Sequence, residues 1–113
     1  MLETTIDAES RGGAVTFTVR VTNHGEDPVE LQFSDSQRVR VTVYPEDDEA
    51  PTWRSDEGRM FAQMLGSERV PAGEELVFEE VWEDPEVGEY RAVADVVSRE
   101  ADLRAETTFA VSP

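Results

Sequence analysis

Hydrophobic and polar residues alternate along most of this chain. In Ala14–Asn23 the apolar residues Val15, Phe17, Val19 and Val21 are each separated by one polar residue. A period of two puts one row of side chains on a buried face and the other row in water, as in a half-buried β-strand. The pattern therefore predicts a strand over this segment.

The alternation recurs in other short segments, and turn signals separate them. It predicts strands at Leu2–Ala8, Val29–Phe33, Val39–Tyr44, Glu74–Trp82, Tyr90–Val97 and Leu103–Val111. We interpret Ser10–Gly13 and Asn23–Pro28 as turns, because glycine adopts positive φ and proline cannot donate to a sheet ladder. No long segment has the period of a helix.

Short strands separated by turns are typical of a β-sandwich, and 113 residues fit one domain. Gly88-Glu89-Tyr90 resembles the Gly-x-Tyr at the start of a late sandwich strand, where the tyrosine hydroxyl bonds to upstream backbone. We therefore expect an all-β fold: an immunoglobulin-like β-sandwich of about seven to eight antiparallel strands, forming a single domain over residues 1–113.

Charge narrows the possible partners. The chain has 26 acidic and 10 basic residues, all of the bases are arginine, and the net charge is -16. Such a charge repels phosphate backbones and anionic lipid, so we expect neither nucleic acid nor membrane as a partner. Concentrated salt relieves the self-repulsion, because the Debye length falls to about 3 Å at 1 M. An acidic, halophilic, cytoplasmic protein is expected, since the sequence shows no signal-peptide pattern.

The sequence contains no pattern typical of a catalytic site or of a metal-binding site. There is no cysteine, and the single histidine, His24, lies in a turn without a nearby nucleophile. The acidic run Glu46–Glu49 is contiguous and lacks the glycine of a calcium loop. Without lysine there is no P-loop. We therefore expect a protein that is not an enzyme and has no cofactor and no metal site.

The segment Trp53–Leu65 breaks the alternation with a bulky, partly basic sequence. One interpretation is structural: Trp53, Phe61 and Leu65 close the open edge of the sandwich, while two polar side chains, Gln37 and Ser55, cap backbone groups that the irregular segment leaves unpaired. In this interpretation Arg54 and Arg59 pair with neighbouring acids.

The other interpretation is functional, because an irregular segment on a rigid scaffold can present side chains to a partner. Aromatic residues, methionine and arginine are the types that anchor protein interfaces. An exposed Arg54 or Arg59 would suit a trypsin-like specificity pocket. The candidate partner-binding residues are Gln37, Trp53, Arg54, Ser55, Arg59, Met60 and Phe61.

The order and spacing of several residues resemble the BsuPI family of intracellular proteinase inhibitors. These residues are Leu31, Phe33, Gln37, Trp53, Ser55, Phe61, Gln63, Pro71, Gly73, Trp82, Gly88 and Tyr90, and the resemblance runs from about Val15 to Val97. It implies an immunoglobulin-like sandwich that inhibits an intracellular serine proteinase as a non-enzymatic protein-binding domain. Asp35-Ser36 stand where the family often has Thr-Gly.

The alternative function is a structural or assembly module without a proteinase target. Such a module would pair a sheet edge or an aromatic patch with itself or with another chain. The expected oligomeric state is accordingly a monomer or a weak homodimer.

Overall fold

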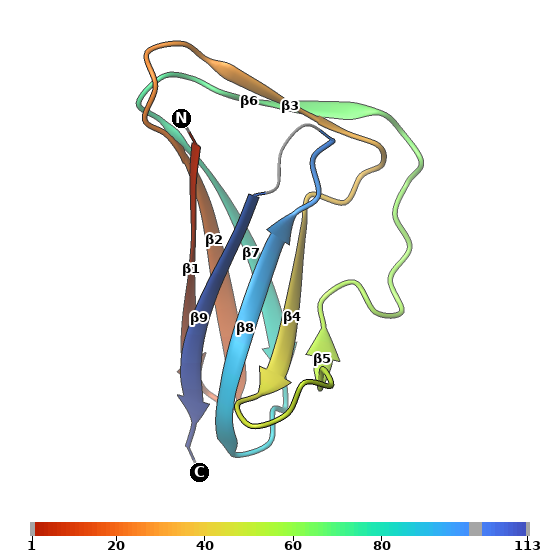
Figure 1. The fold of residues 1–113 in the computed structure, drawn as a ribbon. Helices are drawn as coiled ribbons and strands as arrows, with labels where there is room; N and C mark the ends of the chain where they lie inside the picture. The colour runs from red at the N-terminus through yellow and green to blue at the C-terminus, as the bar shows by residue number, and fades with distance from the viewer. Residues whose placement is uncertain (1, 100–102, 113) are drawn as a thin grey trace.

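Nine strands and no helix make up residues 2–99 and 103–112, the part of the chain that the computed structural model describes (Figure 1). In chain order they are β1 (Leu2–Arg11), β2 (Ala14–Asn23), β3 (Val29–Phe33), β4 (Val39–Pro45), β5 (Trp53–Arg54), β6 (Gly66–Val70), β7 (Glu75–Glu83), β8 (Gly88–Val96) and β9 (Leu103–Val111). The predicted all-β fold is confirmed. The number of strands exceeds the expected seven to eight because two strands were not predicted: β5, which has only two residues, and β6.

Two antiparallel sheets face each other around one apolar core. One has the order β1-β2-β7 and the other β5-β4-β8-β9. The alternation in β2 predicted its inner face correctly, since Val15, Phe17, Val19 and Val21 are fully buried. They pack with residues of β4 and β8 in a single cluster, which is the arrangement of an aligned β-sandwich. The immunoglobulin-like sandwich is therefore confirmed.

Strands β3 and β6 form a separate two-stranded sheet at one end of the sandwich, beyond a bend that follows β2 and precedes β7 (Figure 1). Asn23 is fully buried at this bend and stabilises it by hydrogen bonds. Its Nδ2 donates to the carbonyl oxygens of Asp27 at 2.8 Å and Val70 at 3.0 Å, and its Oδ1 accepts from the Gly25 amide at 2.8 Å. Burial of an amide side chain costs little when its hydrogen bonds are satisfied in this way.

The predicted hydrogen bond from the hydroxyl of Tyr90 to the backbone upstream of it is present. The Tyr90 hydroxyl donates to the Glu86 carbonyl oxygen at 2.6 Å, and its ring packs edge-on against Trp82. This contact joins the start of β8 to the opposite sheet. Strand β8 is central, between β4 and β9.

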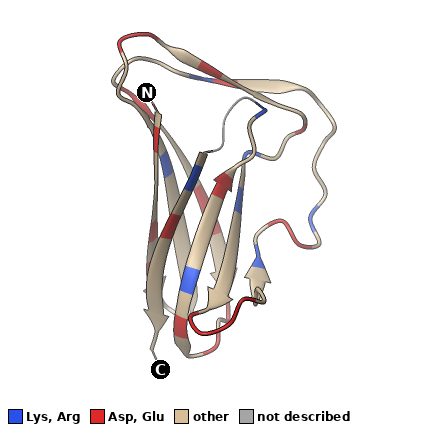
Figure 2. Ribbon diagram, in the orientation of Figure 1, with Lys and Arg blue, Asp and Glu red and all other residues tan. Residues whose placement is uncertain are grey.

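The two open sides of the sandwich are closed differently. On one side β1 and β9 lie against each other (Figure 1). On the other side the segment after β5 contacts β4 through Ser55 and β7 through Arg59, and it contains the candidate site. Acidic residues lie on most strands, and the loop from β4 to β5 begins with the four consecutive acids Glu46–Glu49 (Figure 2). No helix among the described residues is long and apolar enough to cross a membrane.

Candidate functional site

Trp53 closes the gap between the two sheets. Strand β5 pairs with β4, with Trp53 opposite Val43, and this pairing directs the indole toward the other sheet. The ring stacks on Phe17 of β2 at 5.8 Å and on Trp82 of β7 at 5.9 Å between centroids. Offset aromatic stacks of this kind add stability beyond the area that they bury. The predicted packing role of Trp53 is confirmed.

Ser55 caps the backbone of β4. Its amide donates to the Val41 carbonyl oxygen at 2.9 Å, and its Oγ accepts from the Val41 amide at 2.9 Å. The side chain is buried, so both backbone groups of Val41 are satisfied where β5 has already ended. This confirms the predicted capping role.

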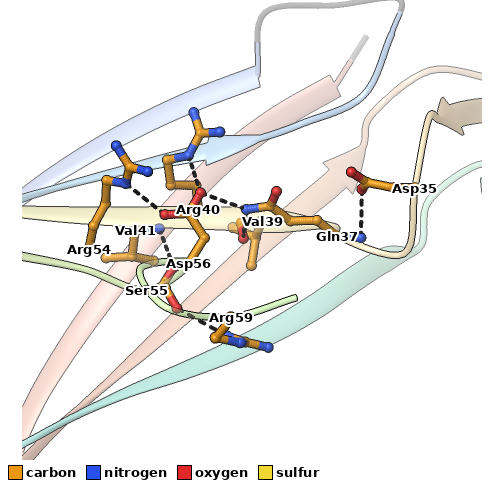
Figure 3. Close-up of polar contacts among 9 residues, drawn as sticks. All are labelled: Asp35, Gln37, Val39, Arg40, Val41, Arg54, Ser55, Asp56 and Arg59. Atoms are coloured by element: carbon orange, nitrogen blue, oxygen red, sulfur yellow. Dashed lines mark hydrogen bonds and ion pairs between the residues drawn. The ribbon is translucent and has the colours of Figure 1, made fainter. Parts of the chain in front are cut away.

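The Asp56 carboxylate accepts hydrogen bonds from three side chains, and the Asp56 side chain is 9% exposed (Figure 3). Arg54 Nε donates to Oδ1 at 2.6 Å, and Arg40 Nε at 2.8 Å and Gln37 Nε2 at 3.2 Å donate to Oδ2. Burial alone would raise the pKa of Asp56, but the hydrogen bonds from Arg40, Arg54 and Gln37 outweigh it and lower the pKa from 3.8 to about 2. Asp56 therefore stays ionised and joins β4 to the segment after β5.

Gln37 completes this network from the turn just before β4. Its side chain is buried, and Nε2 also lies 3.4 Å from the Val39 carbonyl oxygen. The backbone amide of Gln37 donates to Asp35 Oδ1 at 2.9 Å, which shapes the turn before β4. The predicted capping role of Gln37 is confirmed.

The two candidate arginines both pair with acids. Arg54 pairs with its sequence neighbour Asp56, as predicted, whereas the acid partner of Arg59 is Glu80 of β7. Arg59 Nη1 lies 2.9 Å from Glu80 Oε1 and 3.2 Å from the Ser55 carbonyl oxygen. Its guanidinium also lies over the Phe61 ring at 5.2 Å. Arg59 thus bridges the two sheets across the open edge.

Beyond this bridge the chain leaves the sandwich. We call Trp53–Asp56 the docked segment and Arg59–Leu65 the projecting segment. The projecting segment has no regular secondary structure and is anchored at Ala62, whose carbonyl oxygen accepts from the Ser36 amide and whose amide donates to Ser36 Oγ, both at 2.9 Å. Met60 and Met64, on either side of this anchor, are 98% and 70% exposed.

The predicted packing of Leu65 at the sandwich edge is wrong, because this side chain is 76% exposed. The chain after Ala62 turns toward β6, which pairs with β3 beyond the end of the sandwich, so Leu65 is carried away from the core. Phe61 is half-buried beneath the guanidinium of Arg59. Phe61 therefore closes the edge of the sandwich only in part, and the prediction for this residue is partly confirmed.

The seven candidate residues divide by accessibility. Gln37 and Ser55 are buried, Trp53 and Phe61 are half-buried, and Arg54, Arg59 and Met60 are exposed. Their role in partner binding stays a prediction. Asp56, which holds Gln37 and Arg54, was missed, because acids are so abundant in the sequence that no pattern singles it out. Within the described residues there is no group of three potential metal ligands.

The fold and site define a small all-β protein of the immunoglobulin-like type in which an irregular segment closes one edge of the sandwich. A family model described as intracellular proteinase inhibitor (BsuPI) matches residues 2–101, and the chain belongs to this family. The recognised resemblance is thereby confirmed. A search of curated proteins finds no match.

Several solved structures share the fold. The CARDB domain of the PF1109 protein from Pyrococcus furiosus, in complex with di-metal ions, matches with a TM-score of 0.55 and 20% identity over 98% of this chain and 92% of that chain. The solution structure of R. palustris CsgH matches with a TM-score of 0.50 and 17% identity over 94% and 90%. A β-glucosidase from Kluyveromyces marxianus, in complex with glucose, matches with a TM-score of 0.55 and 16% identity, and this chain spans only 14% of its length. At these identities the likeness shows the fold alone.

Proposed function

We propose that this protein inhibits an intracellular serine proteinase by placing the projecting segment in the enzyme's substrate cleft. Membership of the intracellular proteinase inhibitor family supports a proteinase as the partner. The observation that carries the proposal is Met60, whose side chain is 98% exposed within a segment fixed on both sides.

An inhibitory segment must be rigid before it binds, because ordering it on binding would reduce affinity. Without a disulfide, rigidity here comes from non-covalent anchors. Arg59 is held by Glu80 and by the Ser55 carbonyl oxygen, and Ala62 is held by both hydrogen bonds to Ser36. Met60 lies between these two anchors and points into solvent.

The same contacts predict the kind of specificity pocket. Arg54 and Arg59 already pair with Asp56 and Glu80, so neither is available to a trypsin-like pocket without losing its partner. Met60 is unbranched and apolar, and its side chain adapts to differently shaped apolar cavities. The expected target is therefore a serine proteinase with a hydrophobic pocket, of the chymotrypsin or subtilisin kind.

The setting that fits the chain is a salt-loaded cytoplasm. The family is described as intracellular, and the net charge of -16 without any lysine is best tolerated where salt screens repulsion. Membership of an inhibitor family supports a non-enzymatic role, and the binding geometry proposed above requires no catalytic group.

The test is a titration of subtilisin with the purified protein in concentrated KCl, following hydrolysis of a chromogenic peptide. The expected result is inhibition at a near-stoichiometric ratio. Met60→Glu should weaken inhibition about 100-fold, as for loss of a central interface contact. Val87→Glu is the matched control, because this apolar side chain is also exposed (61%) and lies in the turn between β7 and β8, outside the projecting segment. Hydrolysis of the protein as an ordinary substrate, without slowing of the reporter reaction, would overturn the proposal.

A further inference from the structure

Strand β7 has a long edge that no other described strand covers. Within residues 2–99 and 103–112, β7 pairs with β2 on one side only. The register runs without interruption from Thr22 opposite Glu75 to Ala14 opposite Glu83. The other sheet edges are short or covered, since β5 has two residues, β3 and β6 have five each, and β1 lies against β9. Edges of this length are usually protected, because they accept other chains.

The direction of the backbone groups on β7 follows from bonds at both ends of the ladder. The Asp84 amide donates to the Gly13 carbonyl oxygen, and the Asn23 amide donates to the Glu74 carbonyl oxygen. In an antiparallel pair, hydrogen-bonded and non-bonded positions alternate. Counting inward from either end, the even-numbered residues of β7 bond to β2. The amide and carbonyl groups of the odd-numbered residues, which include Val77, Glu79 and Val81, therefore point toward the free edge.

The outward side chains of the same residues form a regular pattern of charge and apolar surface. Glu75, Val77, Glu79, Val81 and Glu83 alternate with inward-facing residues, and Val77 and Val81 are 49% and 48% exposed. Neither Glu79 nor Glu83 forms an ion pair with any residue that the structure describes. The exposed face of β7 thus presents acids and valines in turn.

Edge strands are normally protected from pairing by proline, by lysine or by an inward-facing charge. Strand β7 contains neither proline nor lysine, and its only inward-facing charge is Glu80. That charge is neutralised by Arg59 at 2.9 Å. A hollow of about 350 Å³ lies beside the edge, bounded on one side by Val77–Glu80 and on the other by Arg59, Phe61 and the turn at Ser36. Beside Val77–Glu80 the edge therefore has room for a stretch of another backbone.

We propose that the free edge of β7 accepts an extended segment of a partner protein as an added strand, with basic side chains opposite the glutamates and apolar side chains opposite the valines. Main-chain hydrogen bonds supply affinity in such strand addition, and alternate side chains supply selectivity. Opposite charges on neighbouring strands stabilise the pair, and like charges directly opposite each other destabilise it. The proposal goes beyond the proposed inhibition and does not rest on it.

A second copy of this chain fits the edge poorly. The antiparallel register that pairs Val77 with Val81 would place Glu79 opposite itself and Glu75 opposite Glu83. These like-charge contacts oppose self-pairing. A basic, alternating segment meets the same edge without them.

The probe for the test is a blocked synthetic nonapeptide, Arg-Thr-Val-Thr-Arg-Thr-Val-Thr-Arg, whose pattern reads the same in both directions. The control peptide has the same composition with its arginines and valines clustered, so it has the same charge without the alternation. Each is added to the full chain at about 0.1 M and about 1 M KCl, where the Debye length falls from about 10 Å to about 3 Å. Circular dichroism checks the fold in both salts.

The readout is amide hydrogen exchange of β7, resolved by residue. In the free protein the amides of Leu76, Phe78 and Glu80 should be protected by β2, and those of Glu79 and Val81 should exchange rapidly. The alternating peptide should protect Glu79 and Val81, and the clustered peptide should not. Protection should be weaker at the higher salt.

Two variants assign the effect to the edge. Glu79→Arg should weaken binding of the alternating peptide about tenfold, and a peptide with glutamate at its centre should recover that loss. Glu89→Arg on β8 is the matched control, with the same change in charge far from the β7 edge. Val81→Lys is a second variant should Glu79→Arg fail to fold. Met60→Glu should leave peptide binding unchanged, which separates this proposal from the proposed inhibition.

Equal binding of both peptides, binding without protection of the Glu79 and Val81 amides, or no binding in either salt would each overturn the proposal. So would protection of these amides in the free protein that rises with its concentration, because that result would assign the edge to a second copy of this chain.

Discussion

The docked and projecting segments are neighbours in sequence, but their surroundings differ sharply. In the docked segment Trp53 lies between two aromatic rings, and Ser55 and Asp56 are bonded to β4. In the projecting segment Met60 is 98% exposed, and the chain touches the sandwich mainly through single anchors. One irregular stretch thus contains both a structural closure and a surface that is free to bind.

The difference separates two interpretations that the sequence left open. Bulky and basic residues in this stretch suggested either a plug or an interface. In the docked segment the side chains contact both sheets, whereas Met60 and Met64 of the projecting segment are exposed. Substitutions in the docked segment should therefore change stability, and substitutions at Met60 should change binding alone.

The largest effect on stability is expected from Trp53→Ala. Removal of the indole leaves a gap between Phe17 and Trp82, and the free energy of unfolding should fall by about 3 kcal/mol. Urea unfolding in concentrated KCl, followed by far-UV circular dichroism, measures the change. Trp53→Phe keeps a ring in the stack and should cost less. A loss below about 1 kcal/mol for the alanine variant would mean that the docked segment does not close the sandwich.

A smaller, pH-dependent effect is expected at Asp56. Its pKa in the folded protein is about 2, below the ordinary 3.8, so the unfolded chain binds the proton more readily. The resulting stabilisation is fully present above the ordinary pKa and is lost as the pH falls toward about 2. It amounts to at most about 2 kcal/mol.

Comparison with Asp56→Asn isolates this contribution from the other carboxylates, which titrate in both proteins. Wild type should be the more stable protein at neutral pH, and the difference in unfolding free energy should shrink as the pH falls through the acidic range. A difference that stays constant with pH would show that the charge of Asp56 contributes nothing to the docked segment.

The smallest effect on stability is expected from Met64→Ser. This side chain is 70% exposed and packs against no core residue, so the free energy of unfolding should change by less than about 0.5 kcal/mol. Thermal and urea unfolding both measure it. A clear destabilisation would mean that the projecting segment contributes to the fold and is not a free surface.

Most of the fold was predictable because its strands carry their own pattern. The alternation in β2 and β8 sets which side chains enter the core, and the structure follows it. Strand β6 carries no such pattern, since it is defined by pairing with β3. At its first residue, Gly66, a Cβ would lie 2.7 Å from Arg38 Nη2, so glycine leaves room for that guanidinium.

The site was only partly predictable because its contacts are distant in sequence. Trp53 and Ser55 were assigned correctly, since a bulky aromatic and a short hydroxyl in an irregular stretch have few other uses. Asp56 depends on Arg40 of β4, and Arg59 depends on Glu80 of β7. Neither pairing has a local signal in a chain with 26 acidic residues.

The stack at the edge of the sandwich gives this protein a built-in optical reporter. The chain has two tryptophans, and both are in that stack, with ring centroids 5.9 Å apart. Intrinsic tryptophan emission therefore reports on one place, the contact between the docked segment and β7. Quenching or a spectral shift would reveal loosening of this junction, or a ligand arriving beside it, without any added label.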